Sequence, residues 1–179
     1  MNQKASIGLP LVTVVIPAYN HAGYLREAVR SVLNQSYPQI ELIVIDDGST
    51  DDTAQVLATL DGDFRWFSQD NAGQSQTLAR GWDEARGEIL AYLSADDCLE
   101  SQAVEVAVAA LQADAALAAV YPDFNLIDPA SNVVRRVEAP DFDYATMLSS
   151  VICPIGPGAF FRRSSYRQAG SWRTEFRQM

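Results

Sequence analysis

The chain has few of the side chains that build several common catalytic and structural sites. Its 179 residues include one histidine, His21, and two cysteines, Cys98 and Cys153. A histidine-rich metal site or a Ser-His-Asp triad is therefore poorly supported. Two cysteines without a CxxC pair predict neither a disulfide framework nor a cysteine zinc motif. The chain also lacks a G-x-G-x-x-G loop and a P-loop, which argues against a dinucleotide dehydrogenase and a P-loop nucleotidase.

Basic charge and long apolar runs are also scarce. Lysine and arginine number 13 against 23 aspartates and glutamates, which gives a formal net charge of −10. A nucleic-acid binder needs a basic face, so we expect no nucleic-acid partner. A phosphorylated small molecule stays possible, because a bound metal ion reverses the local charge. Pro10 and Pro17 bound the first apolar run, so we expect no signal peptide or membrane span and a cytoplasmic protein.

Apolar runs alternate with helix-type patterns through the first half of the chain. A composition that is 48% hydrophobic predicts one globular domain over residues 1–179, with residues 1–10 as a loose leader. The alternation is typical of a doubly wound α/β fold with a mainly parallel sheet. The predicted strands are 11–16, 41–45, 64–67 and 89–93, with helices over 25–33, 51–60 and 75–85 between them. After residue 97 we expect a helix over 103–111, a strand over 118–121, a hairpin of 124–127 with 133–137, a helix over 144–150 and an apolar strand from about 159.

Acidic pairs follow two of these strands. Asp96 and Asp97 come after the run 89–93, and Asp46 and Asp47 come after the run 41–45. Ligands bind at the carboxyl edge of an open α/β sheet. Two adjacent carboxylates repel each other, and Mg²⁺ or Mn²⁺ with oxygen ligands relieves that repulsion. The alternative is a solvated Asp-Asp turn that caps the next helix.

A third strand end carries Pro17, Tyr19 and Asn20. Tyr19 offers an aromatic face for a nucleobase, although tyrosine at a strand end is also a common burial residue. One carboxylate can accept the N–H of a uracil or thymine ring and another can accept ribose hydroxyls. Asn20 can cap the helix that follows.

Six motifs together resemble the family-2 glycosyltransferases with the GT-A fold, a Rossmann-like domain whose mainly parallel sheet is flanked by helices. The motifs span 14–20, 44–50, 71–75, 85–89, 93–97 and 158–163. The resemblance implies metal-dependent transfer of a sugar, usually with inversion, from a UDP- or dTDP-linked donor to a glycan, a lipid-linked acceptor or another hydroxyl. It implies Mn²⁺ or Mg²⁺ as cofactor. The family's usual setting is polysaccharide biosynthesis, with peripheral membrane association of the full-length enzyme.

The resemblance also assigns residues to roles. Tyr19 would stack on the base, Asp47 would bind the base edge, and Asp96 would bind the ribose, with Asp46 as a further nucleotide-binding residue. Asp97 would bind the metal, and Asp96 and Asp97 form the expected catalytic pair. Pro17, Asn20 and Gly73 would shape the nucleotide pocket. Ser94 stands where the family often has Asp or Asn, so a strict D-x-D triplet is absent.

The resemblance divides the chain into a nucleotide-binding half, residues 11–98, and the start of an acceptor half, residues 99–179. The family's acidic base is expected just after the segment 170–176, and Glu175 is the nearby substitute, although an ordinary surface glutamate is the simpler interpretation. We therefore expect this chain to bind donor nucleotide and to transfer sugar poorly.

Two other functions fit parts of the pattern. One is a nucleotide-sugar binding module without turnover. The other is a metal-dependent phosphohydrolase with Asp46 or Asp47 as the nucleophile. Residues 45–50 superficially resemble the D-x-D-G-T pattern of haloacid-dehalogenase-type enzymes, but here the acids are adjacent and follow the second strand.

Overall fold

A mixed sheet forms the centre of the molecule. The computed structural model describes residues 8–150, 153 and 155–174. In this part of the chain, a six-stranded sheet has the order β3-β2-β1-β4-β8-β5. Its strands are β1 (Val12–Ala18), β2 (Ile40–Asp46), β3 (Arg65–Ser68), β4 (Ile89–Tyr92), β5 (Ala119–Val120) and β8 (Phe160–Arg162). The pairs β3-β2, β2-β1 and β1-β4 are parallel, as the sequence predicts, whereas β8 pairs antiparallel with both β4 and β5.

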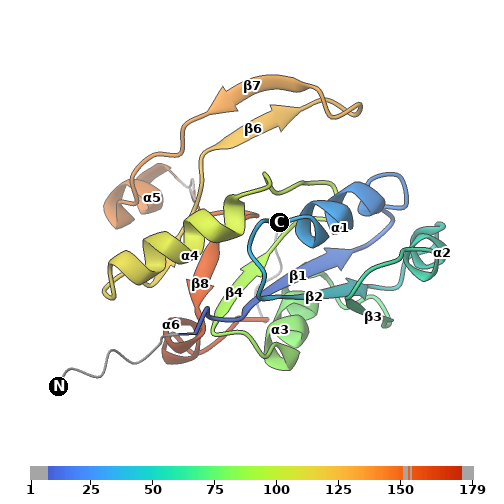
Figure 1. Ribbon diagram of the computed structural model, residues 1–179, viewed down its shortest axis with the longest axis horizontal. Coiled ribbons are helices and arrows are strands. Elements are labelled where there is room, and N and C mark those ends of the chain that lie inside the picture. Colours follow the sequence, from blue (N-terminus) through green and yellow to red (C-terminus); the bar gives the residue numbers. More distant parts are fainter. Residues whose placement is uncertain (1–7, 151–152, 154, 175–179) are drawn as a thin grey trace.

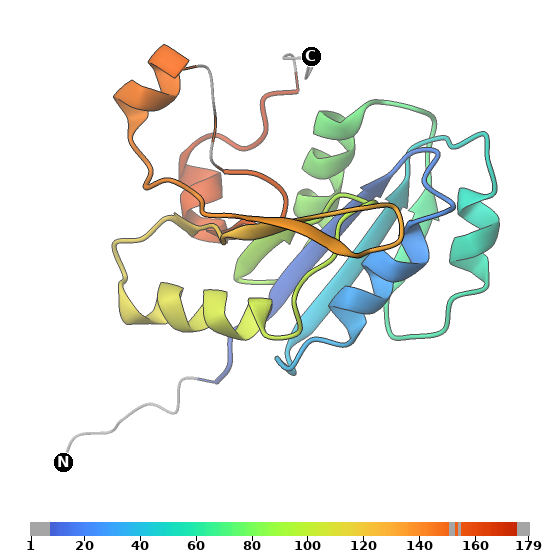
Figure 2. The same ribbon diagram turned by 90° about the horizontal axis from the view of Figure 1, so that it is seen from above.

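Helices cover both faces of this sheet (Figures 1 and 2). They are α1 (Leu25–Leu33), α2 (Thr53–Ala58), α3 (Gln74–Glu84), α4 (Ala103–Ala113) and α6 (Arg163–Gln168). Figure 2 shows α1 and α4 on one side of the sheet and α3 and α6 on the other. The strands are therefore buried on both faces, which explains why they read as continuous apolar runs.

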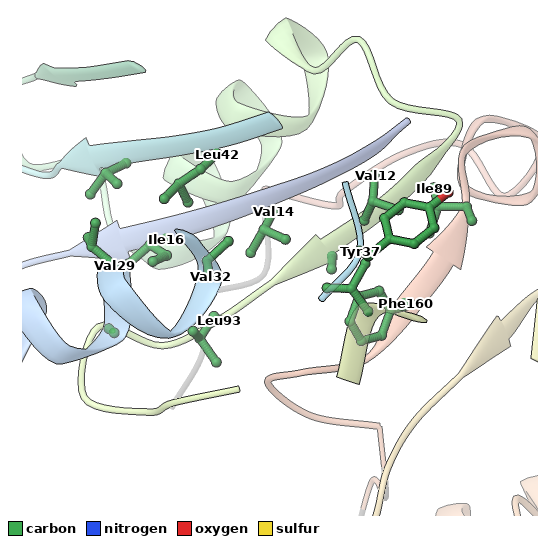
Figure 3. Close-up of a cluster of buried hydrophobic side chains, with 14 of the residues drawn as sticks. Val12, Val14, Ile16, Val29, Val32, Tyr37, Leu42, Ile89, Leu93 and Phe160 are labelled. Carbon is green, nitrogen blue, oxygen red and sulfur yellow. The ribbon is translucent and has the colours of Figure 1, made fainter. Parts of the chain in front are cut away.

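Alternate residues of the strands feed two separate apolar clusters, because successive side chains point to opposite faces. Val14 and Ile16 of β1 pack with Val29 and Val32 of α1 in the larger cluster, and Figure 3 shows these side chains together with Leu42. On the other face the core is built from β1, β2, β4 and α3. Its fully or nearly fully buried members are Val15, Ile43, Ile45, Leu78, Trp82, Ala85 and Leu90. The two clusters fix the strand ends relative to one another.

The buried carboxylate of Glu41 is neutralised by hydrogen bonds and arginine side chains. Glu41 is only 6% exposed and accepts hydrogen bonds from Thr13 Oγ1 (2.6 Å), Arg86 Nε (2.7 Å) and an Arg65 guanidinium nitrogen (3.0 Å). Burial would raise the pKa of Glu41, but the hydrogen bonds from Thr13 and Arg86 outweigh it and hold the pKa below the ordinary value. The network ties β1, β2 and β3 to the segment that leads into β4.

A two-stranded hairpin stands apart from the six-stranded sheet. It consists of β6 (Phe124–Ile127) and β7 (Val133–Val137), and α5 (Tyr144–Ser150) follows it. In Figure 1 the hairpin lies above α1 and α4. Ser131 Oγ at its turn donates a hydrogen bond of 2.7 Å to Glu27 of α1, and α5 has no buried residue. Both elements match the sequence expectation, but they pack only lightly on the rest.

Candidate functional site

The parallel strands β1, β2 and β4 end at the same edge of the sheet, and a cleft of about 400 Å³ lies there. Five residues predicted from the sequence line it, namely Pro17, Tyr19, Asp47, Gly73 and Asp96. The remaining lining residues are Ala18, His21, Asn71, Gln74, Ser94 and Ala95. The cleft is thus built from the three strand ends and the loop before α3.

Asp47 forms part of this cleft and also holds that loop. Its side chain is 3% exposed, and its Oδ1 accepts hydrogen bonds from Gln69 Nε2 (2.7 Å) and the Ala72 amide (2.9 Å). Its Oδ2 accepts one hydrogen bond, from the Gly73 amide at 2.9 Å, among the residues that the structure describes. A carboxylate offers about four acceptor positions. One position on Oδ2 therefore stays available for a ring N–H of a ligand.

Gly73 makes this arrangement possible. Its φ is +85°, in the left-handed region that glycine adopts at little cost. This turn brings the amides of residues 72 and 73 to the Asp47 carboxylate just before α3 begins.

Asp46 and Asn20 do not line the cleft. Asp46 is as buried as Asp47, but its carboxylate accepts hydrogen bonds from the Ser49 amide (3.1 Å) and Ser68 Oγ (2.9 Å). Asn20 has a φ of +57°, and its Oδ1 accepts a hydrogen bond of 2.8 Å from the Thr50 amide. Both side chains hold the turns after β1 and β2.

The prediction that Asn20 caps the next helix is wrong. α1 begins at Leu25, with Tyr24 as its N-cap residue and no capping hydrogen bond from a side chain. Asn20 is committed to Thr50 instead, so the chain passes through a further turn before the helix starts.

Tyr19 presents an exposed aromatic surface at the cleft. It is 46% exposed and follows the buried Ala18 at the end of β1. A half-exposed ring on a fixed strand end is well placed to stack on a planar ligand.

The acidic pair after β4 divides into one exposed and one half-buried carboxylate. The Asp96 side chain is 53% exposed and lines the cleft, whereas Asp97 donates its amide to the Ser94 carbonyl at 3.1 Å. Burial and, next, the charge of Asp96 raise the pKa of Asp97, partly offset by a hydrogen bond from Ser94. The alternative that this pair caps the next helix is wrong, because α4 begins at Ala103 with Gln102 as its N-cap.

Asp96 and Asp97 are suitable ligands for a hard divalent cation such as Mg²⁺ or Mn²⁺, which prefers oxygen ligands. Burial and the adjacent charge of Asp96 raise the pKa of Asp97, so a cation at this position would relieve that electrostatic cost. In the described part of the chain, no three His, Cys, Asp or Glu side chains converge on one point. Mg²⁺ is commonly held by one or two carboxylates together with phosphate oxygens of a substrate, and Asp97 and Asp96 offer that donor set.

His21 is a member of the site that sequence reasoning missed. Its Nδ1 lies 2.7 Å from the Tyr19 carbonyl oxygen and its Nε2 lies 3.9 Å from Oδ2 of Asp96. The signal available in the sequence is its position, two residues after Tyr19 at a strand end.

A smaller cavity of about 210 Å³ adjoins the cleft and shares Asp96 with it. Tyr24, Glu27 and Cys98 line it together with the hairpin turn. Burial and the charges of Glu27 and Asp97 raise the pKa of the Cys98 thiol to about 11. Cys98 is therefore a neutral thiol at physiological pH and no ready nucleophile.

Sequence comparison identifies relatives of this chain. The model of the family described as "Glycosyl transferase family 2" matches residues 13–170. Chondroitin synthase of Escherichia coli is 34% identical over 149 residues, which cover 81% of this chain and 22% of that protein. Hyaluronan synthase of Pasteurella multocida is 32% identical over 148 residues, which cover 80% of this chain and 15% of that protein. The chain thus corresponds to less than a quarter of each of these two relatives.

Solved structures share the architecture. The mannosyltransferase PcManGT of Pyrobaculum calidifontis, in complex with GDP-Man and Mn²⁺, has a TM-score of 0.70 and 25% identity, over 94% of this chain and 49% of that one. The S. aureus protein TarS, residues 1–349, has a TM-score of 0.75 at 18% identity and covers 94% of this chain and 52% of that one, a likeness of fold. These matches confirm the GT-A expectation. No helix of the described residues has the length and apolar content needed to cross a bilayer. With a family model that matches most of its length, the chain belongs to glycosyl transferase family 2.

Proposed function

We propose that this chain forms the donor-binding part of a metal-dependent, inverting glycosyltransferase that takes its sugar from a UDP- or dTDP-linked donor. The observation that carries the proposal is the convergence of Tyr19, Asp47 and Asp96 on one cleft at the ends of β1, β2 and β4. The relatives named as chondroitin and hyaluronan synthases support a role in polysaccharide biosynthesis with a glycan or lipid-linked acceptor.

The cleft offers one contact for each part of the nucleotide. The exposed ring of Tyr19 stacks on the base, and the free acceptor position of Asp47 takes the imino N–H that uracil and thymine share. Asp96 accepts a ribose hydroxyl, and its neighbour Asp97, which is not among the residues that line the cleft, holds the metal ion for the diphosphate. Mn²⁺ or Mg²⁺ bound at this pair supplies Lewis-acid assistance and charge neutralisation to the leaving diphosphate.

In the reaction, the acceptor hydroxyl oxygen bonds to the anomeric carbon while the bond from that carbon to the diphosphate oxygen breaks. One in-line displacement inverts the configuration. The acceptor proton passes to a general base, a role that we assign to none of the described residues; Glu175 lies outside them. In this scheme we assign Asp96 and Asp97 as the catalytic pair, because they are adjacent carboxylates at the end of β4 and Asp96 lines the cleft.

The phosphohydrolase alternative loses support from the same geometry. An aspartyl nucleophile needs a free oxygen that faces the substrate. The Asp46 carboxylate is buried against Ser49 and Ser68 and does not line the cleft. Asp47 uses most of its acceptor capacity on the loop before α3.

Calorimetric titration of UDP, dTDP and GDP with and without Mn²⁺ tests the proposal. We expect the pyrimidine diphosphates to bind and Mn²⁺ to strengthen that binding. Tyr19→Ala should weaken UDP binding about 5- to 150-fold, since base stacking on an aromatic contributes about 1–3 kcal/mol. Tyr24→Ala is the matched control, because Tyr24 is 44% exposed and lines the smaller cavity only.

Equal losses in both tyrosine variants would contradict the assignment of the base site. Equal UDP affinity in EDTA and in Mn²⁺ would contradict the metal dependence. Release of sugar from the bound UDP-sugar then separates an enzyme from a binding module. Cytoplasmic localisation and peripheral membrane association of the full-length enzyme stay predictions, which fractionation of cells tests.

A further inference from the structure

His21 and Asp96 lie next to each other at the cleft without a hydrogen bond between them. The distance from His21 Nε2 to Asp96 Oδ2 is 3.9 Å, beyond the usual hydrogen-bond range. Both residues line the cleft, and their side chains are 35% and 53% exposed. A ligand that lies beside the two atoms in the cleft can therefore contact both of them.

The other side of the imidazole determines what His21 offers to that ligand. Nδ1 lies 2.7 Å from the Tyr19 carbonyl oxygen, and a carbonyl oxygen only accepts hydrogen bonds. When the ring is neutral, this contact places its proton on Nδ1 and makes Nε2 an acceptor. Asp96 Oδ2 is also an acceptor. Within the described part of the chain no residue donates a hydrogen bond to either atom.

Two acceptors this close together match a ligand with two neighbouring hydroxyl groups. One hydroxyl carries one proton and satisfies one acceptor, whereas a vicinal diol satisfies both. We infer that His21, together with Asp96, reads both hydroxyls of a ribose and makes the cleft selective for ribonucleoside diphosphates over deoxyribonucleoside diphosphates. The inference rests on the proposed function, and it narrows the donor from a UDP- or dTDP-linked sugar to a UDP-linked one.

The backbone at His21 is held independently of the ring, which makes side-chain variants informative. The His21 amide donates a hydrogen bond of 3.0 Å to Thr53 Oγ1. His21→Phe keeps a planar ring and this backbone bond but removes both nitrogens. His21→Gln keeps a side-chain oxygen that can accept a hydrogen bond.

The experiment measures the affinities of UDP, 2′-deoxy-UDP and 3′-deoxy-UDP by calorimetry in the natural protein and in both variants. We expect the natural protein to prefer UDP over one of the deoxy nucleotides by about tenfold, a typical value for one lost hydrogen bond. In His21→Phe this preference should fall to about one, with the affinity for that deoxy nucleotide unchanged. This non-additivity identifies a direct contact, and His21→Gln should retain part of the preference.

Identical preferences in the natural protein and in His21→Phe would overturn the inference. So would a loss in His21→Phe that is equal for all three nucleotides and disappears in EDTA, since His21 would then act through the cation. If UDP binds in a Tyr19-dependent way and the preferences do not change, only this inference fails. If no nucleoside diphosphate binds the natural protein, the proposed function fails with it.

Discussion

Neighbouring residues of the same type have different roles at the edge of the sheet where β1, β2 and β4 end. Asp46 and Asp47 are neighbours with equal burial, yet only Asp47 lines the cleft. The acidic pair is visible in the sequence, and so is its place at a strand end. Which member faces the ligand depends on the turn at residues 48–50 and on Ser68 of β3, and these partners are brought together only by the fold.

We predict that Asp46→Ala lowers stability and spares nucleotide binding. The substitution leaves the Ser49 amide and the Ser68 hydroxyl without their acceptor, which costs about 1–3 kcal/mol. Urea denaturation measures the loss, and calorimetry with UDP should give an affinity within about twofold of the natural value. An unchanged free energy of unfolding combined with lost UDP binding would assign Asp46 to the nucleotide site instead.

Asp97→Ala should have the opposite profile. The half-buried Asp97 carboxylate has a raised pKa because it lies in a desolvated position beside Asp96, so its removal relieves repulsion in the free protein. We expect metal-dependent UDP binding to weaken by about 1–3 kcal/mol, by analogy with a lost charged hydrogen bond. The measurement is UDP affinity in Mn²⁺ and in EDTA. A large drop in melting temperature with normal binding would make Asp97 a structural residue.

At the scale of elements, the sequence predicts the parallel strands of the main sheet well, but it does not predict that β8 inserts antiparallel between β4 and β5. Strands β1 to β4 are recognisable in the sequence as apolar runs. The helices between them are recognisable because their apolar residues fall on one face. The apolar run that forms β8 is also recognisable in the sequence. Its composition does not show whether it pairs parallel or antiparallel, and its partner strands β4 and β5 lie far away in the sequence. The predicted bounds of the helix 25–33 agree with α1, but its cap is not predictable, because Asn20 bonds to the turn after β2, a contact between segments 30 residues apart.

The Glu41 network gives a pH dependence that belongs to these elements. The folded pKa of Glu41 is lowered, so its contribution to stability is present above the ordinary pKa of 4.5 and is lost as the pH falls through the folded value. At pH 7, Glu41→Gln should cost about 1–3 kcal/mol, because the buried site loses charged hydrogen bonds while the arginine partners, 72% and 47% exposed, remain solvated.

Urea denaturation of both proteins between pH 7 and pH 3 checks this expectation. The difference in free energy of unfolding between the natural protein and Glu41→Gln should shrink as the pH falls. This difference cancels the contributions of the other carboxylates. A difference that stays constant across the range would show that the charge of Glu41 is not what stabilises the fold.

At the scale of the whole molecule, the net charge of −10 opposes the binding of a diphosphate. Asp47 and Asp96 line the cleft itself, so the repulsion is strongest where the ligand enters. Without a divalent cation, we expect UDP affinity to rise when ionic strength increases from about 10 mM to about 100 mM, because the screening length falls from about 30 Å to about 10 Å. With Mn²⁺ present the increase should be smaller or reversed. Calorimetry at both salt concentrations checks this, and weaker binding at high salt in EDTA would contradict it.

The apolar surface of the hairpin and α5 affects how such experiments are read. Exposed large apolar side chains gather between residues 124 and 148: Phe124, Leu126, Ile127, Val133, Val134, Phe142, Tyr144 and Leu148. The exposure of so many large apolar side chains within one short stretch is unusual for a folded domain. A dye that fluoresces when it binds apolar surface should therefore bind the native protein. In a thermal-shift assay it would give high fluorescence before the protein unfolds. Trp82 packs against Phe161, Tyr166 and Trp172 in the core, so intrinsic tryptophan emission gives the cleaner optical signal of unfolding.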